Sequence, residues 1–272
     1  MLKTRIITAA ILLLILLAVL YSGSSIAFSV VLTVFYAGAT WESARLFGKE
    51  KPLLGPALWT IAFVIALTQQ QFVAMYLLFS LCAAIWAIRL APTLYVGLPP
   101  VGSIGNRLVS GIYGIALFGC FLAIAVLYQT SAVYLLSAMI IVWIADVGAY
   151  FAGKAFGKRK LAPSISPGKS WEGAIGGWLS VLIFAYIAAG MDEGNVTFFS
   201  HIQNNWGGVG LFGVMTLLVV ASVVGDLFES LLKRRIGMKD SSNLLPGHGG
   251  ILDRVDALIP VLPLVVLLDW LI

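Results

Sequence analysis

The chain alternates between long apolar runs and short polar segments, and each run is close to 20 residues long. The runs cover residues 6–21, 26–41, 53–68, 72–90, 108–127, 132–152, 171–190, 209–230 and 256–272. A helix needs about 20 consecutive apolar residues to cross a bilayer, and continuous rather than alternating hydrophobicity argues against a β-barrel. The pattern predicts an all-α integral membrane protein with about nine transmembrane helices, folded as a single multi-pass domain over residues 1–272.

Basic residues fall on one side of these predicted spans. If the N-terminus is inside, all 17 Lys and Arg residues lie in, or at the edges of, the inner segments 1–5, 42–52, 91–107, 153–170 and 231–255. The outer segments, "SGSS", "TQQQ", "YQTS" and 191–208, contain none. Because cytoplasmic loops are enriched in Lys and Arg, we expect the N-terminus inside and, with an odd number of spans, the C-terminus outside.

Composition agrees with this interpretation, since 60% of the residues are hydrophobic and 11% are charged, against about 25% charged in soluble domains. The first run follows Lys3 and Arg5 and could be a signal peptide, but no small-residue cleavage site stands out, so we expect an uncleaved helix. Cys82 and Cys120 lie within apolar runs and are interpreted as packing residues. The longer inner segments come late, which puts the expected catalytic region at about 140–260 on the cytoplasmic face.

Asp146, in "VWIADVGAYFAG", lies near the inner end of the sixth predicted span. Ionisable residues at such depth are rare and commonly face a cavity or a partner. Asp146, Tyr150 and Gly153 are spaced i, i+4, i+7, so they share one helix face. The alternative is a carboxylate that snorkels or pairs with a loop lysine.

The segment "SPGKSWEG" places Ser166, Lys169, Ser170 and Glu172 at the start of the seventh predicted span. Backbone N–H groups at a helix N-terminus, together with a lysine, form a natural phosphate site. Ser170 is equally well explained as an ordinary N-cap. The basic residues 158–160 just before it are interpreted as contacts with anionic lipid headgroups.

A polar stripe follows the inner end of the eighth predicted span, where Ser222, Asp226, Glu229 and Lys233 are spaced i, i+4, i+7, i+11. Two carboxylates one turn apart suit Mg²⁺, which prefers carboxylate, water and phosphate oxygens. For Glu229 and Lys233 an intrahelical ion pair is the alternative.

The stretch "LPGHGGILDRVDALIP" brings Asp253, Arg254 and Asp256 to the start of the ninth predicted span. Carboxylates there could simply complement a helix N-terminus, but glycines also permit close ligand approach. His248 has no second histidine on the inner face, because His201 is outside, so a zinc site is not expected. No nucleophile elbow accompanies the histidine, which argues against Ser-His-Asp hydrolysis.

The predicted inner face therefore combines carboxylates for a metal, Lys and Arg for phosphates, and glycine-rich turns at the bilayer edge. The chain has no P-loop and no GxGxxG motif. This combination indicates phosphate chemistry on a lipid. An ion-coupled transporter with ion sites at Asp146 and Asp226 is the alternative from another class, but no internal repeat is visible and the charges cluster at one face rather than at the midplane.

Residues 230–256, "SLLKRRIGMKDSSNLLPGHGGILDRVD", closely resemble the signature of the phosphatidate cytidylyltransferases, or CDP-diacylglycerol synthases. "GDLFES", "ADVGAYFAG" and "SPGKSWEG" are similar to further segments of that family, so the resemblance covers about residues 130–260 by motif. Gly168 stands where the family usually has Lys or Asn, which puts a side-chain role there in doubt, and Ser170 replaces Thr but keeps the hydroxyl. The matching positions of the signature are Ser230, Lys233, Arg234, Lys239, Asp240, Pro246, His248, Gly249, Gly250, Asp253, Arg254 and Asp256.

The resemblance implies transfer of CMP from CTP to phosphatidate, giving CDP-diacylglycerol and pyrophosphate, with Mg²⁺ as cofactor. The metal ligands expected from it are Asp226, Asp253 and Asp256. The expected catalytic residues are Asp226, Lys233, Arg234, Asp253 and Arg254. The expected substrate-binding residues are Asp146, Ser166, Lys169, Ser170, Glu172, Lys239, Asp240, His248, Gly249 and Gly250.

Expected partners are CTP, phosphatidate and membrane lipids, with no nucleic acid, and the expected location is the bacterial plasma (inner) membrane. A CTP-dependent polyprenol or phytol kinase shares part of the "SPGKSWEG" pattern and is the alternative enzyme, but "GHGGILDRVD" favours the cytidylyltransferase. "GAIGG", residues 173–177, has the GxxxG spacing that supports helix association, which makes a homodimer conceivable.

Overall fold

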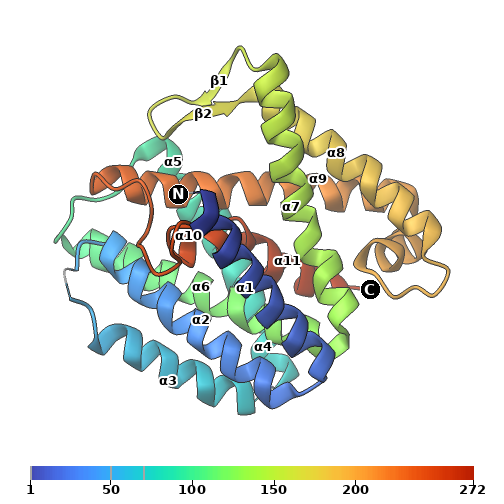
Figure 1. Ribbon diagram of the computed structural model, residues 1–272, viewed down its shortest axis with the longest axis horizontal. Helices are drawn as coiled ribbons and strands as arrows, with labels where there is room; N and C mark the ends of the chain where they lie inside the picture. Colours follow the sequence, from blue (N-terminus) through green and yellow to red (C-terminus); the bar gives the residue numbers. More distant parts are fainter. Residues whose placement is uncertain (1, 50, 70) are drawn as a thin grey trace.

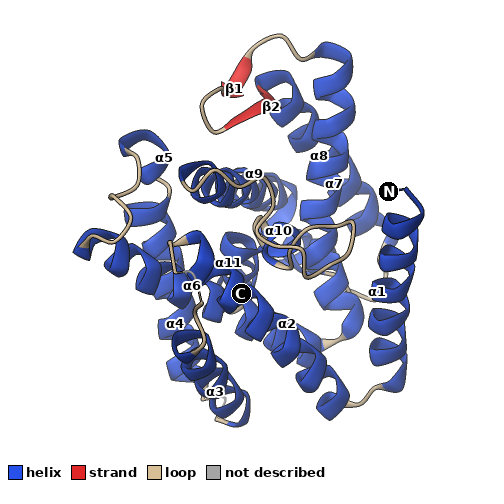
Figure 2. Cartoon of the chain, turned by 60° about the vertical axis from the view of Figure 1, so that its left-hand side comes forward, coloured by secondary structure: helices blue, strands red, loops and turns tan. Residues whose placement is uncertain are grey.

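The computed structural model describes residues 2–49, 51–69 and 71–272, and is mostly helical (Figures 1 and 2). Gln70, in the predicted outer segment "TQQQ", lies outside the described residues. The first half contains α1 (Leu2–Ser22), α2 (Ser25–Leu46), α3 (Leu54–Thr68), α4 (Phe72–Ile85), the π-helix η1 (Trp86–Leu90), α5 (Thr93–Val96) and α6 (Ile104–Thr130). The second half contains α7 (Ala132–Phe156), β1 (Lys160–Ala162), β2 (Ser166–Ser170), α8 (Trp171–Met191), α9 (Phe198–Arg235), α10 (Leu252–Val255) and α11 (Leu258–Asp269).

Each of the nine predicted apolar runs coincides with helix in the described residues. Six helical segments there are long and apolar enough to cross a membrane: Ser25–Leu46, Phe72–Val96, Ile104–Thr130, Ala132–Phe156, Trp171–Met191 and Phe198–Arg235. Leu54–Thr68 and Leu258–Asp269 are apolar but shorter. The prediction of a mostly helical integral membrane protein is therefore confirmed in its coarse form.

Two local predictions need correction. The inner segment 153–170 is not only loop, because β1 and β2 pair antiparallel in a hairpin that extends beyond the ends of α7 and α8 in both views (Figures 1 and 2). The segment 191–208 is not an outer loop throughout, because α9 begins at Phe198, where Thr197 supplies the N-cap. Phe198 and Phe199 are buried, so this first part of α9 packs into the protein before the backbone kinks at Gly207.

Helices α7 and α8 pack tightly against each other, and small residues make the close approach possible. A Cβ on Gly177 would lie 2.5 Å from the carbonyl oxygen of Ala145, and one on Gly173 would lie 2.9 Å from that of Ala149. The GxxxG pair therefore faces α7 of the same chain. The spacing that suggested a homodimer is explained by packing within one chain.

The interior of the bundle is built around α6 and α11. Helix α11 packs against α4, α6 and α9, and most of its side chains are buried. Cys82 and Cys120 are free and buried in the same core, which confirms their interpretation as packing residues. This arrangement fixes the C-terminal end of α9 next to α10 and α11, where Lys233 and Asp253 meet.

Candidate active site

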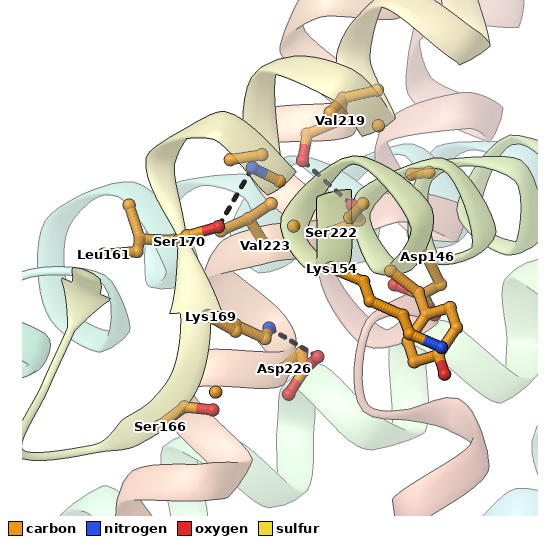
Figure 3. A pocket seen from close by; sticks show the side chains of 18 residues that line it. Asp146, Lys154, Leu161, Ser166, Lys169, Ser170, Val219, Ser222, Val223 and Asp226 are labelled. Carbon is orange, nitrogen blue, oxygen red and sulfur yellow. Dashed lines mark hydrogen bonds and ion pairs between the residues drawn. The ribbon is translucent and has the colours of Figure 1, made fainter. Parts of the chain in front are cut away.

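A cavity of about 560 Å³ lies between α7, the β-hairpin, α8 and α9 (Figure 3). Ligand pockets in proteins span about 300–1,000 Å³, so its size suits a nucleotide or a lipid headgroup. Its wall includes many small residues of α7 and α8, which leave room for a ligand. The polar side chains lining it are Asp146, Tyr150, Lys154, Ser166, Lys169, Ser170, Ser222 and Asp226. Five of these were predicted as site residues, namely Asp146, Ser166, Lys169, Ser170 and Asp226.

The ion pair between Lys169 and Asp226 is the main polar contact inside this cavity (Figure 3). The Lys169 Nζ atom lies 2.5 Å from Oδ2 of Asp226, and both side chains keep more than a quarter of their surface exposed. Asp226 also accepts a hydrogen bond from the Ser230 hydroxyl at 3.3 Å. Asp146 lies close enough for the charges of Asp226 and Lys169 to act on it. The cavity therefore presents both charge signs to a ligand.

Ser170 and Glu172 hold the hairpin in place. The Ser170 hydroxyl accepts a hydrogen bond from the backbone N–H of Gly173 at 3.1 Å, so it is the N-cap of α8. The Glu172 carboxylate accepts hydrogen bonds from the backbone N–H groups of Lys158 and Arg159. Glu172, predicted to bind substrate, therefore has a structural role at the base of the hairpin that carries Lys169.

Lys233 lies between two carboxylates in the last turn of α9. Its Nζ atom is 2.6 Å from Oε2 of Glu229 and 2.7 Å from Oδ1 of Asp253. The Glu229–Lys233 ion pair considered from the spacing is therefore present. All three side chains are largely buried, so this triad joins α9 to α10 and Lys233 has little surface left for a phosphate.

Asp253 organises the loop before α10. Its Oδ2 atom accepts hydrogen bonds from the backbone N–H of Gly250 at 2.7 Å and from the N–H and hydroxyl of Ser241, each at 2.9 Å. Burial opposes ionisation of Asp253, but the hydrogen bonds and charge of Lys233, with the backbone N–H groups, hold its pKa below the usual range. With both carboxylate oxygens engaged, Asp253 acts here as a loop-holding residue rather than as a free metal ligand.

Gly249 and Gly250 have a steric reason to be glycines. Gly249 adopts a φ of +84°, which residues with a side chain rarely tolerate. A Cβ on Gly250 would lie 1.9 Å from the Ser241 hydroxyl oxygen. Both positions were predicted to bind substrate, and the structure gives each a role in folding the loop.

The remaining predicted residues surround this loop. The Arg254 guanidinium donates to the carbonyl oxygen of His248 at 2.6 Å, and the Arg234 Nε–H donates to that of Ile165 at 3.3 Å, which ties α9 to the hairpin. Lys239 and Asp240 are exposed. None of these residues is among those that line the cavity, whereas Lys169 and Asp226 are.

Glu42, near the end of α2, was not identified from the sequence. Its side chain is fully buried and contacts the loop before α10 from about 200 residues away in the chain. A single carboxylate directly after the apolar run 26–41 could have marked this residue in the sequence. Its partners could not be identified, because the contact is made only in the tertiary structure.

The predicted metal set is gathered only in part. Among the described residues, no group of three acidic, His or Cys side chains is close enough to hold a metal ion. Asp256 does lie near Asp226, whose charge acts on it, and near Glu229. Oε1 of Glu229 is buried and has no hydrogen-bond partner among the described residues. Mg²⁺ usually takes only one or two carboxylates and completes its shell with water and phosphate oxygens. A site with two carboxylate ligands, Asp226 and Asp256, therefore fits Mg²⁺ better than the predicted set of three, which also included Asp253.

Comparison with known proteins gives consistent matches. Residues 3–271 match the model of the cytidylyltransferase family. A phosphatidate cytidylyltransferase of Pseudomonas aeruginosa is 38% identical over 276 residues, which cover 99% of this chain and 97% of that protein.

Two further alignments are shorter. A phosphatidate cytidylyltransferase of Haemophilus influenzae is 52% identical over 134 residues, covering 47% of this chain and 43% of that protein. One of Bacillus subtilis is 39% identical over 160 residues, covering 59% of this chain and 56% of that protein. The family match extends over almost the whole chain, cavity, hairpin and glycine-rich loop included, and the chain belongs to the cytidylyltransferase family.

Proposed function

We infer that this protein is a phosphatidate cytidylyltransferase, which transfers CMP from CTP to phosphatidate and releases pyrophosphate in phospholipid biosynthesis. The observation that carries this assignment is the cavity that contains Lys169 and Asp226, in a chain of the cytidylyltransferase family. The relatives that share its sequence have this activity in their names. The substrates are accordingly CTP and phosphatidate.

The chemistry requires positioning and charge neutralisation. A phosphate oxygen of phosphatidate attacks the α-phosphorus of CTP, a new P–O bond forms, and the bond to the β-phosphate breaks to release pyrophosphate. A phosphate monoester is already largely ionised near pH 7, so no dedicated general base is needed. The site contributes orientation of the two phosphates and stabilisation of the negative charge.

Lys169 is the residue best placed to bind a phosphate. An ammonium group has three N–H donors, and Asp226 accepts one of them at 2.5 Å, which leaves the others for phosphate oxygens in the cavity. Lys154 lines the same cavity. Arg234, Lys239 and Arg254 surround the nearby loop and provide positive charge for the triphosphate at its edge.

Mg²⁺ is the proposed cofactor, and Asp226 and Asp256 are its proposed ligands. When bound, the ion supplies charge neutralisation at the phosphate oxygens. Asp226 holds Lys169 in the cavity, and Asp256 accepts a hydrogen bond from the backbone N–H of Ala257 at the start of α11. Asp253 keeps the adjacent loop folded.

We propose nine transmembrane spans with the N-terminus and the active site on the cytoplasmic side of a bacterial inner membrane. The one-sided distribution of Lys and Arg supports this orientation. The hairpin and the loop before α10 both belong to the basic segments. A CTP-dependent enzyme needs its nucleotide site on the side where nucleotides are available.

Product analysis of the purified protein tests the activity. Incubation with CTP, phosphatidate and Mg²⁺ is expected to release one pyrophosphate for each CDP-diacylglycerol formed, and none when phosphatidate is omitted. Release of CDP instead of pyrophosphate would identify a lipid kinase and contradict the proposal.

A further inference from the structure

Glu42 is a buried carboxylate without an ion-pair partner. Its side chain has no exposed surface, and none of the ion pairs among the described residues includes it. Burial of a charged group is unfavourable unless charge or hydrogen bonds compensate for it. The compensation at Glu42 comes entirely from one segment, the loop of residues 241–252.

Four donors from this loop surround the two carboxylate oxygens. Oε1 accepts hydrogen bonds from the Ser242 hydroxyl and from the backbone N–H of Ile251 at 3.0 Å. Oε2 accepts from the backbone N–H of Leu252 at 2.6 Å and lies 3.2 Å from the Ser241 hydroxyl, which shares its single proton with Asp253. Hydrogen bonds to an ionised acceptor are stronger than neutral ones, so Glu42 fixes the start and the end of the loop to α2.

The contact leaves no spare room. A Cβ on Gly250 would lie 2.4 Å from Oε1 of Glu42, in addition to its clash with Ser241. The glycine-rich loop therefore folds around this carboxylate, and the carboxylate determines where the backbone of residues 250–252 lies.

A continuous polar chain leads from Glu42 to the inner end of α9. The Ser241 hydroxyl lies 3.2 Å from Oε2 of Glu42 and 2.9 Å from Oδ2 of Asp253. Asp253 in turn contacts Lys233 at 2.7 Å. Ser242 contacts the same Glu42 carboxylate but forms no hydrogen bond with Asp253 among the described residues, so of the two serines only Ser241 connects Glu42 to the triad.

We propose that Glu42 is a positioning residue for the reaction, which acts through Ser241 to fix Asp253 and Lys233 at the end of α9, the helix that contributes Asp226 to the substrate cavity. The inference rests on the proposed CMP transfer at that cavity. Glu42 itself does not contact the reacting atoms. The Glu42 carboxylate sets the position of the loop. Loss of this carboxylate is expected to displace the charged groups of Asp253 and Lys233.

Ser241 and Ser242 offer a matched pair of variants that separates positioning from simple stability. Each is buried, and each has its hydroxyl within hydrogen-bond distance of the Glu42 carboxylate. Ser241 also contacts Asp253 directly, so if Glu42 only stabilises the fold, Ser241→Ala lowers kcat by the same factor in Glu42→Gln as in the wild type. If Glu42 acts through Ser241, Ser241→Ala lowers kcat at least fivefold more than Ser242→Ala does.

The experiment measures kcat and KM for CTP and for phosphatidate on the purified full-length protein, beside thermal unfolding in detergent. Glu42→Gln keeps the shape, but its amide NH₂ faces backbone donors that cannot accept a hydrogen bond. We expect kcat to fall at least tenfold in folded Glu42→Gln protein, with less than threefold change in either KM. Glu42→Asp, which keeps the charge, is expected to recover part of kcat.

The expected coupling is measurable in a double-mutant cycle. Because Ser241 acts together with Glu42, adding Ser241→Ala to Glu42→Gln should lower kcat much less than Ser241→Ala does alone. A kcat of folded Glu42→Gln within twofold of the wild type would overturn the proposal. If Glu42→Gln does not fold, equal kcat losses in the two serine variants would overturn it. An inactive wild-type protein would instead contradict the proposed function.

Discussion

Asp226 has a lysine at 2.5 Å and a serine hydroxyl at 3.3 Å, and it lies in the wall of the cavity. Asp226→Asn keeps the shape of the side chain and removes its charge. We expect the rate of CMP transfer to fall at least about a hundredfold, roughly 2.7 kcal/mol of transition-state stabilisation. Turnover of the purified variant at saturating CTP is the measurement.

The stability of the same variant distinguishes a functional role from a structural one. Partly exposed ion pairs contribute about 0–1 kcal/mol, so loss of the Lys169 pair is expected to change thermal unfolding little. The sequence predicted unchanged or higher stability, because an anion near a helix C-terminus is unfavourable. In the structure α9 continues to Arg235, more than two turns beyond Asp226, so no gain in stability is expected. An active Asp226→Asn enzyme would contradict the role of Asp226.

Lys233 and Lys158 are a contrasting pair of lysines in the inner segments. Lys233 is largely buried between Glu229 and Asp253, whereas Lys158 is exposed just before β1, at the base of the hairpin. Breaking a buried ion pair costs on the order of 3 kcal/mol because a charge is left without a partner. Lys233→Ala is therefore expected to lower kcat/KM at least tenfold more than Lys158→Ala and to lower the unfolding temperature. Equal kcat/KM values for the two variants would refute the distinction.

At the residue scale, sequence spacing identified residues that have an exposed or half-exposed position in the cavity. Lys169 and Asp226 are separated by 57 positions. Each belongs to a group of polar residues that is not required for its own segment to fold, which is why both could be identified. The roles of Glu42, Glu172 and Gly250 could not be predicted. Their partners are backbone N–H groups or side chains of other segments, and a pattern along one segment contains no information about them.

The hairpin is the element that brings Lys169 to the cavity. Its base is held by the Glu172 carboxylate, which accepts from the backbone N–H groups of Lys158 and Arg159. In Glu172→Ala these N–H groups lose their acceptor, so we expect faster amide hydrogen exchange at residues 158–159 than in the wild type. We also expect a smaller loss of kcat/KM than in Lys169→Ala. Unchanged exchange at residues 158–159 would argue against this role.

The helices were predictable because long apolar runs have few alternatives in a membrane. The hairpin was not, because residues 158–170 are rich in Lys, Ser and Pro and have no alternating hydrophobic pattern. The kinked start of α9 was missed for a related reason. Its first helical turns contain polar residues such as Asn204 and Asn205, which lowered the hydrophobicity below that of a span.

The proposed topology is a property of the whole molecule. Cys82 and Cys120 are buried, so a new cysteine at Asn195 or Lys160 can be labelled against a low background. A membrane-impermeant thiol reagent added to intact cells is expected to label Asn195→Cys. It should label Lys160→Cys only after the cells are opened. Labelling of Asn195→Cys only in opened cells would reverse the orientation.

The fold brings the two halves of the chain together at one place. Helix α2 supplies Glu42, and the second half supplies the cavity, the hairpin and the loop of residues 241–252. The sequence indicated a site within residues 140–260, and the cavity lies there. The contribution of α2 depends on helix packing, which the apolar pattern of a membrane span does not specify.

Transfer of CMP, rather than of a terminal phosphate, is the central claim of this account. Purified protein is incubated with phosphatidate, Mg²⁺ and CTP labelled either at the α-phosphate or at the γ-phosphate, and the lipid is then extracted. Label is expected in the lipid from α-labelled CTP alone, and Asp226→Asn should abolish it. Label in the lipid from γ-labelled CTP would contradict the account and identify a kinase.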